Sequence, residues 1–166
     1  MAQALFVTTK DMATFTPMNG NIDVDNLIQY MKIGQDIHIL NYLGSDLYNK
    51  INDDIVASTL TGDYLTLVNT YIKPMVIWYG FYEYLKFAPY SVSNLGIFKH
   101  LSENSESVDD KEIDNLEDKA FSVAENYAQR FIRHMCFNST TFPEYTSNTD
   151  DDVRPDKDVN FTNWFL

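Results

Sequence analysis

The chain has 166 residues, of which 24 are acidic and 12 are basic, so its formal net charge is −12. This charge argues against nonspecific binding to nucleic acid, because that binding needs clustered Lys and Arg side chains to neutralise phosphates. A single cysteine excludes an intrachain disulfide and a zinc site built from several cysteines. No apolar run approaches the 18 or so residues of a membrane-spanning helix, and we expect neither a membrane segment nor a secretory signal.

Residues 1–22 are predicted to form an extended N-terminal arm. Leu5, Phe6 and Val7 make a short apolar run before two threonines, a pattern typical of a strand. An isolated strand needs a partner for its backbone hydrogen bonds. That partner could lie in this chain or in the sheet of a neighbouring subunit, and the sequence leaves both alternatives open.

Residues 23–138 are predicted to form a bundle of about four helices, so the expected fold class is mainly α. Apolar residues recur at steps of three and four over residues 23–43, 45–55, 63–87 and 109–137. The third helix should occupy the centre of the bundle, because its second half is apolar on nearly all sides. Pro74 lies inside it and removes a backbone donor, so we expect a kink there or two abutting helices.

Two further segments are predicted to be extended. The first is a short loop or strand near residues 90–98, where aromatic and β-branched residues follow Pro89. The second is an acidic C-terminal tail, residues 139–166, which has too little apolar content to fold alone. The tail ends in large apolar side chains that are costly to leave in water and should dock on another surface. These are Phe161, Trp164, Phe165 and Leu166.

No catalytic, metal-binding or cofactor-binding site is expected, and we predict that the protein is not an enzyme. His38, His100 and His134 fall in three separate predicted elements, without the short spacing of metal ligands. The sequence also contains no nucleophile elbow, phosphate-binding loop or dinucleotide fingerprint.

An ordered series of short patterns runs through residues 22–137. It comprises Asp25-x-Leu27-Ile28, Ile33-Gly34-Gln35-Asp36, Leu43-Gly44-Ser45-x-Leu47-Tyr48-x-x-Ile51, Leu67-x-x-x-Tyr71-Ile72-x-Pro74, Trp78-Tyr79-x-Phe81-Tyr82 and Ser93-Asn94-x-Gly96-Ile97. The series resembles the head–tail connector (adaptor) proteins of tailed bacteriophages, in the variety seen in phages of Bacteroidetes hosts, including crAss-like phages. The order of the patterns carries the resemblance, since no single pattern is diagnostic.

The resemblance implies a helical-bundle subunit of the virion neck that assembles in the host cytoplasm. Such subunits form a ring, usually dodecameric, below the portal protein, and they present a platform to the next neck or tail protein. DNA passes through the lumen of the ring without specific binding. The family has no catalytic residues to carry over to this chain.

The apolar residues at the two ends of the sequence are the candidate contacts with neighbouring subunits or with the portal. They are Leu5, Phe6 and Val7 in the arm and Phe161, Trp164, Phe165 and Leu166 in the tail. The alternative function is a small acidic inhibitor that mimics DNA and occupies a nucleic-acid-binding protein. That alternative predicts acidic residues spread over a folded surface, whereas the densest acidic run lies in the tail. An enzyme of unidentified type is a third hypothesis.

Overall fold

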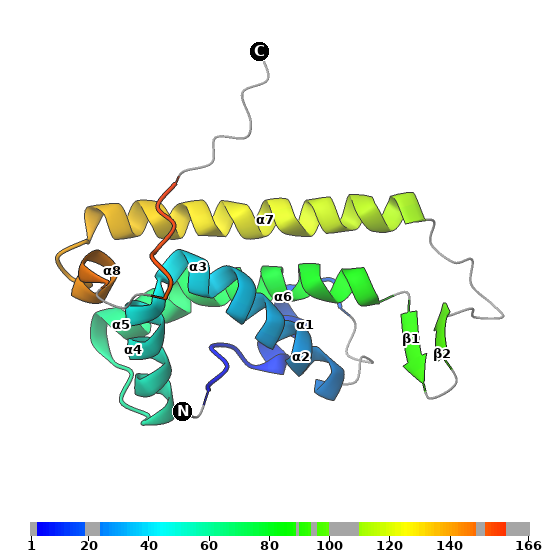
Figure 1. Cartoon of the computed structure of the whole chain (residues 1–166), viewed down its shortest axis with the longest axis horizontal. Helices are drawn as coiled ribbons and strands as arrows, with labels where there is room; N and C mark the ends of the chain where they lie inside the picture. Colours follow the sequence, from blue (N-terminus) through cyan, green and yellow to red (C-terminus); the bar gives the residue numbers. More distant parts are fainter. Residues whose placement is uncertain are drawn as a thin grey trace, which may run out of the picture.

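The structure, a computed structural model, describes residues 3–18, 24–88, 90–93, 96–99, 110–148 and 152–158. It is mainly helical, as predicted (Figure 1). The helices are α1 (Thr9–Phe15), α2 (Val24–Gly34), α3 (Leu40–Leu43), α4 (Ser45–Val56), α5 (Gly62–Leu67), α6 (Lys73–Phe87), α7 (Asp110–Phe137) and α8 (Pro143–Ser147). Strands β1 (Tyr90–Ser93) and β2 (Gly96–Lys99) form an antiparallel hairpin in which Tyr90 pairs with Lys99, where the sequence predicted an extended segment.

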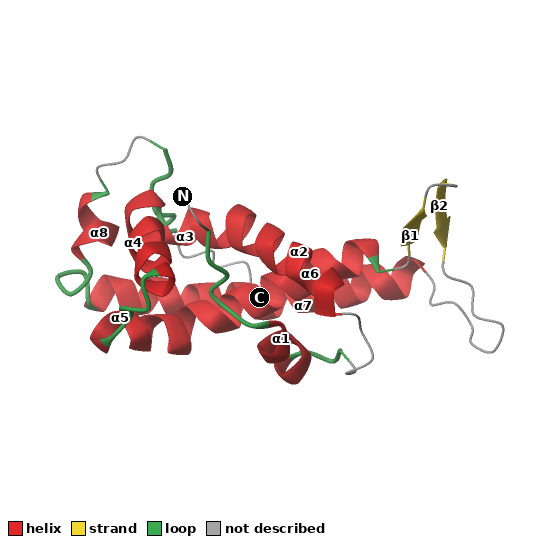
Figure 2. Cartoon of the chain, turned by 90° about the horizontal axis from the view of Figure 1, so that it is seen from below, coloured by secondary structure: helices red, strands yellow, loops and turns green. Residues whose placement is uncertain are grey.

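Three long helices form the body of the molecule, with α6 packed between α2 and α7 (Figures 1 and 2). Both neighbours run antiparallel to α6. Tyr30 of α2 packs against Tyr84, near the end of α6, with ring centroids 5.5 Å apart. His134, near the end of α7, stacks on Tyr71 just before the start of α6, at 4.2 Å.

A glycine pair allows α2 and α6 to cross at close range. A Cβ atom built on Gly34 would lie 2.8 Å from the backbone nitrogen of Gly80, closer than real side chains approach. Any larger residue at position 34 would therefore push the two helices apart.

Two of the predicted helices are continuous but contain a wide turn of π-helix. One turn, η1 (Gln35–Ile39), joins α2 to α3, and the other, η2 (Val68–Ile72), joins α5 to α6. The second ends just before Pro74, and the Lys73 amide donates to the Val68 carbonyl in the wider π pattern. Ile72 and Lys73 keep helical dihedral angles. Of the two alternatives expected at Pro74, a kink or two abutting helices, the second was wrong, because the helix continues through the π turn to Pro74 without a break.

The hydrophobic core includes residues from outside the predicted bundle, residues 23–138. Phe6 and Met12 contribute to it from before the bundle, and Phe142 and Tyr145 contribute from after it. Ala120, Ala124 and Ala128 form a buried stripe on α7 that brings this helix close to α6. The arm and the tail were expected to be extended, but each contains a short helix, α1 or α8, because apolar side chains of both segments are buried in the core.

Candidate subunit-contact surfaces

Residues 3–8 of the N-terminal arm form a loop held by buried side chains, and the strand predicted at residues 5–7 is not formed. The amide of Ala4 donates to Asn52 Oδ1 (2.8 Å), and the amide of Phe6 donates to Gln35 Oε1 (2.9 Å). Gln35 Nε2 in turn donates to the carbonyl of Ala4 (2.9 Å). Both side-chain amides are buried, so they replace the neighbouring strand that the arm was expected to need.

Two of the three candidate contacts in the arm are used within this chain. Phe6 is 3% exposed and Val7 is 4% exposed, and both pack in the hydrophobic core. Leu5 is partly buried against the same core. Of the two alternatives for the arm, the structure thus has the intrachain one, and neither Phe6 nor Val7 presents a surface to a neighbour.

Part of the C-terminal tail docks on the corner between α3 and α4. Residues 152–158, which we call the strap, form three hydrogen bonds with Ser45. The Ser45 amide donates to the Val153 carbonyl (2.9 Å), the Val153 amide donates to Ser45 Oγ (3.0 Å), and Ser45 Oγ donates to Asp152 Oδ2 (3.4 Å). The Asp156 amide donates to the Asn41 carbonyl (2.8 Å). The candidate contacts Phe161, Trp164, Phe165 and Leu166 lie outside the described residues.

Gly44 is the residue that makes room for the strap. Its φ angle of 73° lies in the left-handed region that favours glycine. A Cβ atom at this position would lie 2.6 Å from the ring of Pro155. The corner between α3 and α4 and its cover by the strap therefore depend on the same glycine.

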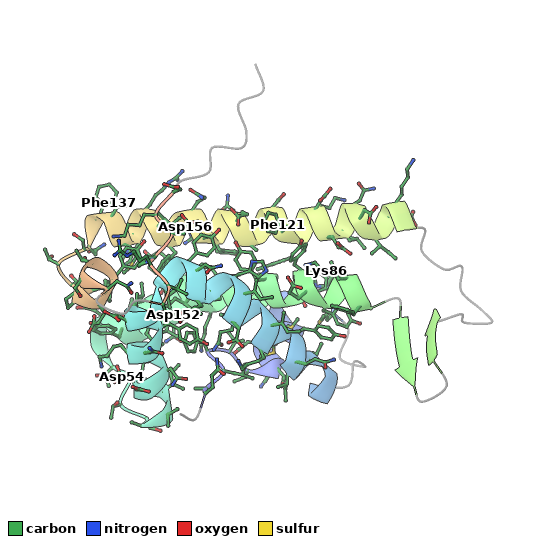
Figure 3. All side chains as sticks on the ribbon, in the orientation of Figure 1. Asp54, Lys86, Phe121, Phe137, Asp152 and Asp156 are labelled. Atoms are coloured by element: carbon green, nitrogen blue, oxygen red, sulfur yellow. The ribbon has the colours of Figure 1, made fainter. Side chains whose placement is uncertain are left out.

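Large apolar side chains are exposed at both ends of the bundle. At the hairpin end, next to β1 and β2, the exposed side chains are Ile28, Phe87 and Leu116. At the opposite end, which we call the α8 end, they are Val56, Leu65 and Phe137. Phe137 is the most prominent, with 89% of its surface exposed at the last residue of α7 (Figure 3). These six side chains are candidate contacts with other molecules, although none of them was among the contact residues predicted from the sequence.

A buried carboxylate links α2–α3 to α6 through the π turn η1. Glu83 is 5% exposed; it accepts a hydrogen bond from Lys86 Nζ (2.9 Å) and lies 3.0 Å from His38 Nε2. Burial alone would lower the pKa of Lys86, but its hydrogen bond and charge interaction with Glu83 raise it overall. The ammonium also lies 4.0 Å from the centroid of the Tyr82 ring. Each charge in this cluster has a partner, which suits a structural role.

A second polar cluster joins α3, α6 and α7. The hydroxyls of Tyr42 and Tyr79 both donate to Glu125 Oε1, at 2.8 Å and 2.5 Å. Burial raises the pKa of both phenols above their usual value, and the carboxylate of Glu125 adds to the shift. Both hydroxyls therefore stay protonated and keep donating to Glu125, which holds the three helices together.

The two described histidines have different neighbours and share no site with the cysteine. His38 lies beside Glu83 and His134 stacks on Tyr71, whereas His100 is outside the described residues. Cys136 is exposed on α7. Within the described ranges, no group of three or more His, Cys, Asp or Glu side chains has the arrangement of a metal site.

Among the described helices, none is both long and apolar enough to cross a membrane.

Comparison with known proteins gives one family. No curated protein and no solved structure matches the chain. Residues 39–154, well over half of the chain, match the family of unknown function DUF6712. The chain therefore belongs to the DUF6712 family.

Proposed function

We propose that this protein is a structural subunit of the neck of a tailed bacteriophage. It forms a ring below the portal protein, connects the capsid to the tail and lets DNA pass through its lumen. Two things support this proposal: the resemblance of residues 22–137 to head–tail connector proteins, and the mainly helical bundle that this resemblance implies.

The observation that carries the proposal is the exposure of different apolar side chains at the two ends of the bundle. A closed ring uses heterologous contacts, in which one surface of each subunit binds a different surface of the next. Such a subunit needs two separate contact surfaces. We assign Phe137, at the α8 end, to one of these contact surfaces and Phe87, at the hairpin end, to the other. The side chain of Phe137 is 89% exposed and that of Phe87 is 51% exposed.

Isolated exposed apolar residues are common on monomeric proteins, so their position matters more than their number. Phe15, Ile37 and Phe121 are exposed along the sides of the bundle. The six at the two ends come from α2, α6 and α7 at the hairpin end and from α4, α5 and α7 at the α8 end. Each end thus exposes apolar side chains from three helices.

The net charge suits a channel through which DNA moves. Each subunit carries a net charge of −12, so a ring would offer few Lys and Arg side chains to take the place of the cations bound to the DNA phosphates. DNA would therefore pass through without binding tightly. The same charge would repel the packaged DNA only over about 8–10 Å at physiological salt.

The decisive experiment measures particle mass and shape. The purified protein is studied by light scattering and negative-stain electron microscopy, alone and with the portal protein encoded by the same phage. We expect either a ring, or a monomer that forms rings only on the portal. A compact monomer that ignores the portal would contradict the proposal and favour the DNA-mimic inhibitor, which is tested by displacement of DNA from a nucleic-acid-binding protein.

A further inference from the structure

A cavity of about 340 Å³ lies between α8 and the strap. Its walls are residues 145–148 on one side and Arg154, Pro155 and Lys157 on the other. Tyr145 packs on Phe131 of α7, with ring centroids 5.9 Å apart, so the cavity lies beside the second half of α7. The strap carboxylates Asp152, Asp156 and Asp158 are not among the residues that line it.

The charged groups that line this cavity are cationic. Two hydroxyl side chains of α8 are engaged, since Thr146 Oγ1 donates to the Ser139 carbonyl (3.1 Å) and Ser147 Oγ donates to the Pro143 carbonyl (2.8 Å). The buried hydroxyl of Tyr145 has no hydrogen-bond partner among the described residues. Lys157 Nζ lies 4.9 Å from the centroid of the Tyr145 ring. Across the part of the chain that the structure describes, neither Arg154 nor Lys157 forms an ion pair. The cavity therefore presents two unpaired positive charges in a strongly acidic protein.

The opposite charge is concentrated at the other end of the same molecule. Asp114, Glu117 and Asp118 lie within little more than one turn of the first half of α7, and both aspartates are exposed. Asp114 and Asp118 are four residues apart, a spacing at which like charges destabilise a helix. Burial raises the pKa of Glu117 and the charges of Asp114 and Asp118 raise it further, while Lys86 of the same chain lowers it without cancelling the rise. A cationic partner on this surface would relieve the repulsion.

The two charged surfaces cannot meet within one subunit. Asp118 precedes Phe131, the residue next to the cavity, by thirteen positions on the same helix, which corresponds to roughly 20 Å at 1.5 Å per residue. A straight helix holds them apart. Only a second copy of the chain can bring an acidic α7 surface of this kind to the cavity.

We propose that the cavity between α8 and the strap receives the acidic first half of α7 from the next copy of this chain. This inference rests on the proposed ring and names its charged contact: Arg154 and Lys157 of one subunit bind Asp114 and Asp118 of its neighbour. The contact is heterologous, because each subunit supplies the cations at its α8 end and the carboxylates toward its hairpin end. Repetition of such a contact closes a ring when the rotation between subunits allows it.

The test is a charge exchange between two variants, studied with or without the portal according to which condition gives rings with the wild type. Variant one carries Arg154→Glu and Lys157→Glu, and variant two carries Asp114→Lys and Asp118→Lys. All four side chains are exposed, so both variants should keep the far-UV circular dichroism spectrum and the melting temperature of the wild type. Each variant alone places like charges across every contact, and we expect at least a tenfold loss of assembly.

The mixture of the two variants provides the matched control. In an alternating ring, the acidic cavity of variant one meets the basic helix of variant two, and the unchanged surfaces meet each other as in the wild type. Equal amounts of the two should therefore restore rings, and so should a single chain that carries all four substitutions. Recovery in neither case, or full assembly of either variant alone, would overturn this contact while leaving the proposed ring in place.

Two further outcomes complete the test. Wild-type protein that forms no assembly, alone or on the portal, would overturn both this contact and the proposed function. The same cations could instead bind DNA phosphates, which is measured as a shift of a duplex oligonucleotide in a gel. Salt-dependent binding by the wild type that variant one loses, with ring formation unchanged in both, would assign the cavity to DNA and overturn the contact between copies.

Discussion

At the scale of single residues, the close approach of α2 to α6 gives a direct prediction for Gly34→Ala. Alanine normally stabilises a helix relative to glycine by about 1 kcal/mol. Here its Cβ would lie 2.8 Å from the backbone of Gly80, which cannot move aside like a flexible side chain. We expect a net destabilisation of about 1–3 kcal/mol, measured by urea unfolding followed by circular dichroism. The exposed control Ser122→Ala should change the free energy of unfolding by less than about 0.5 kcal/mol. A more stable Gly34→Ala variant would show that the helices are not in contact at this point.

His134 predicts how stability changes with pH. Burial lowers the pKa of this imidazole below its usual value of 6.5, and Nδ1 lies 3.3 Å from Asn138 Nδ2, from which the neutral ring can accept a hydrogen bond. The unfolded chain therefore binds the proton at a higher pH than the folded chain does. Stability should fall as the pH drops below about 6.5, while above pH 7 the ring is neutral in both states and has no such effect.

The variant His134→Gln tests this pH dependence, because glutamine does not titrate. Urea midpoints are compared at pH 7.5 and pH 5.0 for both proteins. We expect a smaller loss on acidification in the variant, while the contributions of the carboxylates remain common to both. The variant also loses the stacking on Tyr71, so each protein is referred to its own value at pH 7.5. Equal losses in the two proteins would mean that His134 has the same pKa in the folded and unfolded states.

At the scale of elements, the strap and the aromatic end of the tail should have separable roles. A chain that ends at Asn148 loses the three backbone contacts that the strap makes with Ser45 and Asn41. At about 1 kcal/mol for each hydrogen bond, the free energy of unfolding should fall by about 2–3 kcal/mol, with little change in helix content. A chain that lacks only residues 160–166 keeps the strap and should keep its stability, but its assembly should weaken. Unchanged assembly in this shorter truncation would refute a contact role for Phe161, Trp164, Phe165 and Leu166.

The sequence predicted the four long helical segments because their apolar spacing is a local signal. Helix α7, for example, was expected over residues 109–137 and is found at Asp110–Phe137. The π turns were not predicted, since one additional residue in a turn barely alters that spacing. Helix α1 was missed although Thr8 and Asp11 form a capping box, a pattern that is readable in the sequence.

The contacts of the two ends could not be predicted for a different reason. Residues 5–7 have a strand pattern, yet the amides of Ala4 and Phe6 donate to the distant side chains of Asn52 and Gln35. The cavity likewise depends on the strap, which crosses from α8 to the corner at Gly44. Interactions between residues so far apart in the chain leave no periodic signal, so the structure was needed to find them.

At the scale of the whole molecule, the exposed residues at the ends of the bundle matter to assembly and little to folding. Phe137 is 89% exposed, so Phe137→Ser removes few contacts within the subunit and should leave the melting temperature unchanged. Burial of such a side chain in an interface is worth about 1.5–3 kcal/mol, which is roughly a tenfold change or more in the association constant of each contact. The loss of association free energy is repeated at every contact of a ring. The Phe137→Ser substitution should therefore reduce the amount of assembled ring strongly.

Ile37→Ser is the control for this prediction. Ile37 is also an exposed apolar residue, with 53% of its surface accessible, but it lies along the side of the bundle in η1. Sedimentation of each variant with the portal protein should show loss of the large species for Phe137→Ser and its retention for Ile37→Ser. If both variants behave alike, general surface hydrophobicity drives association and the ends of the bundle have no special role. If Ile37→Ser alone fails, the contact lies along the side of the bundle, and the subunits must pack flank to flank.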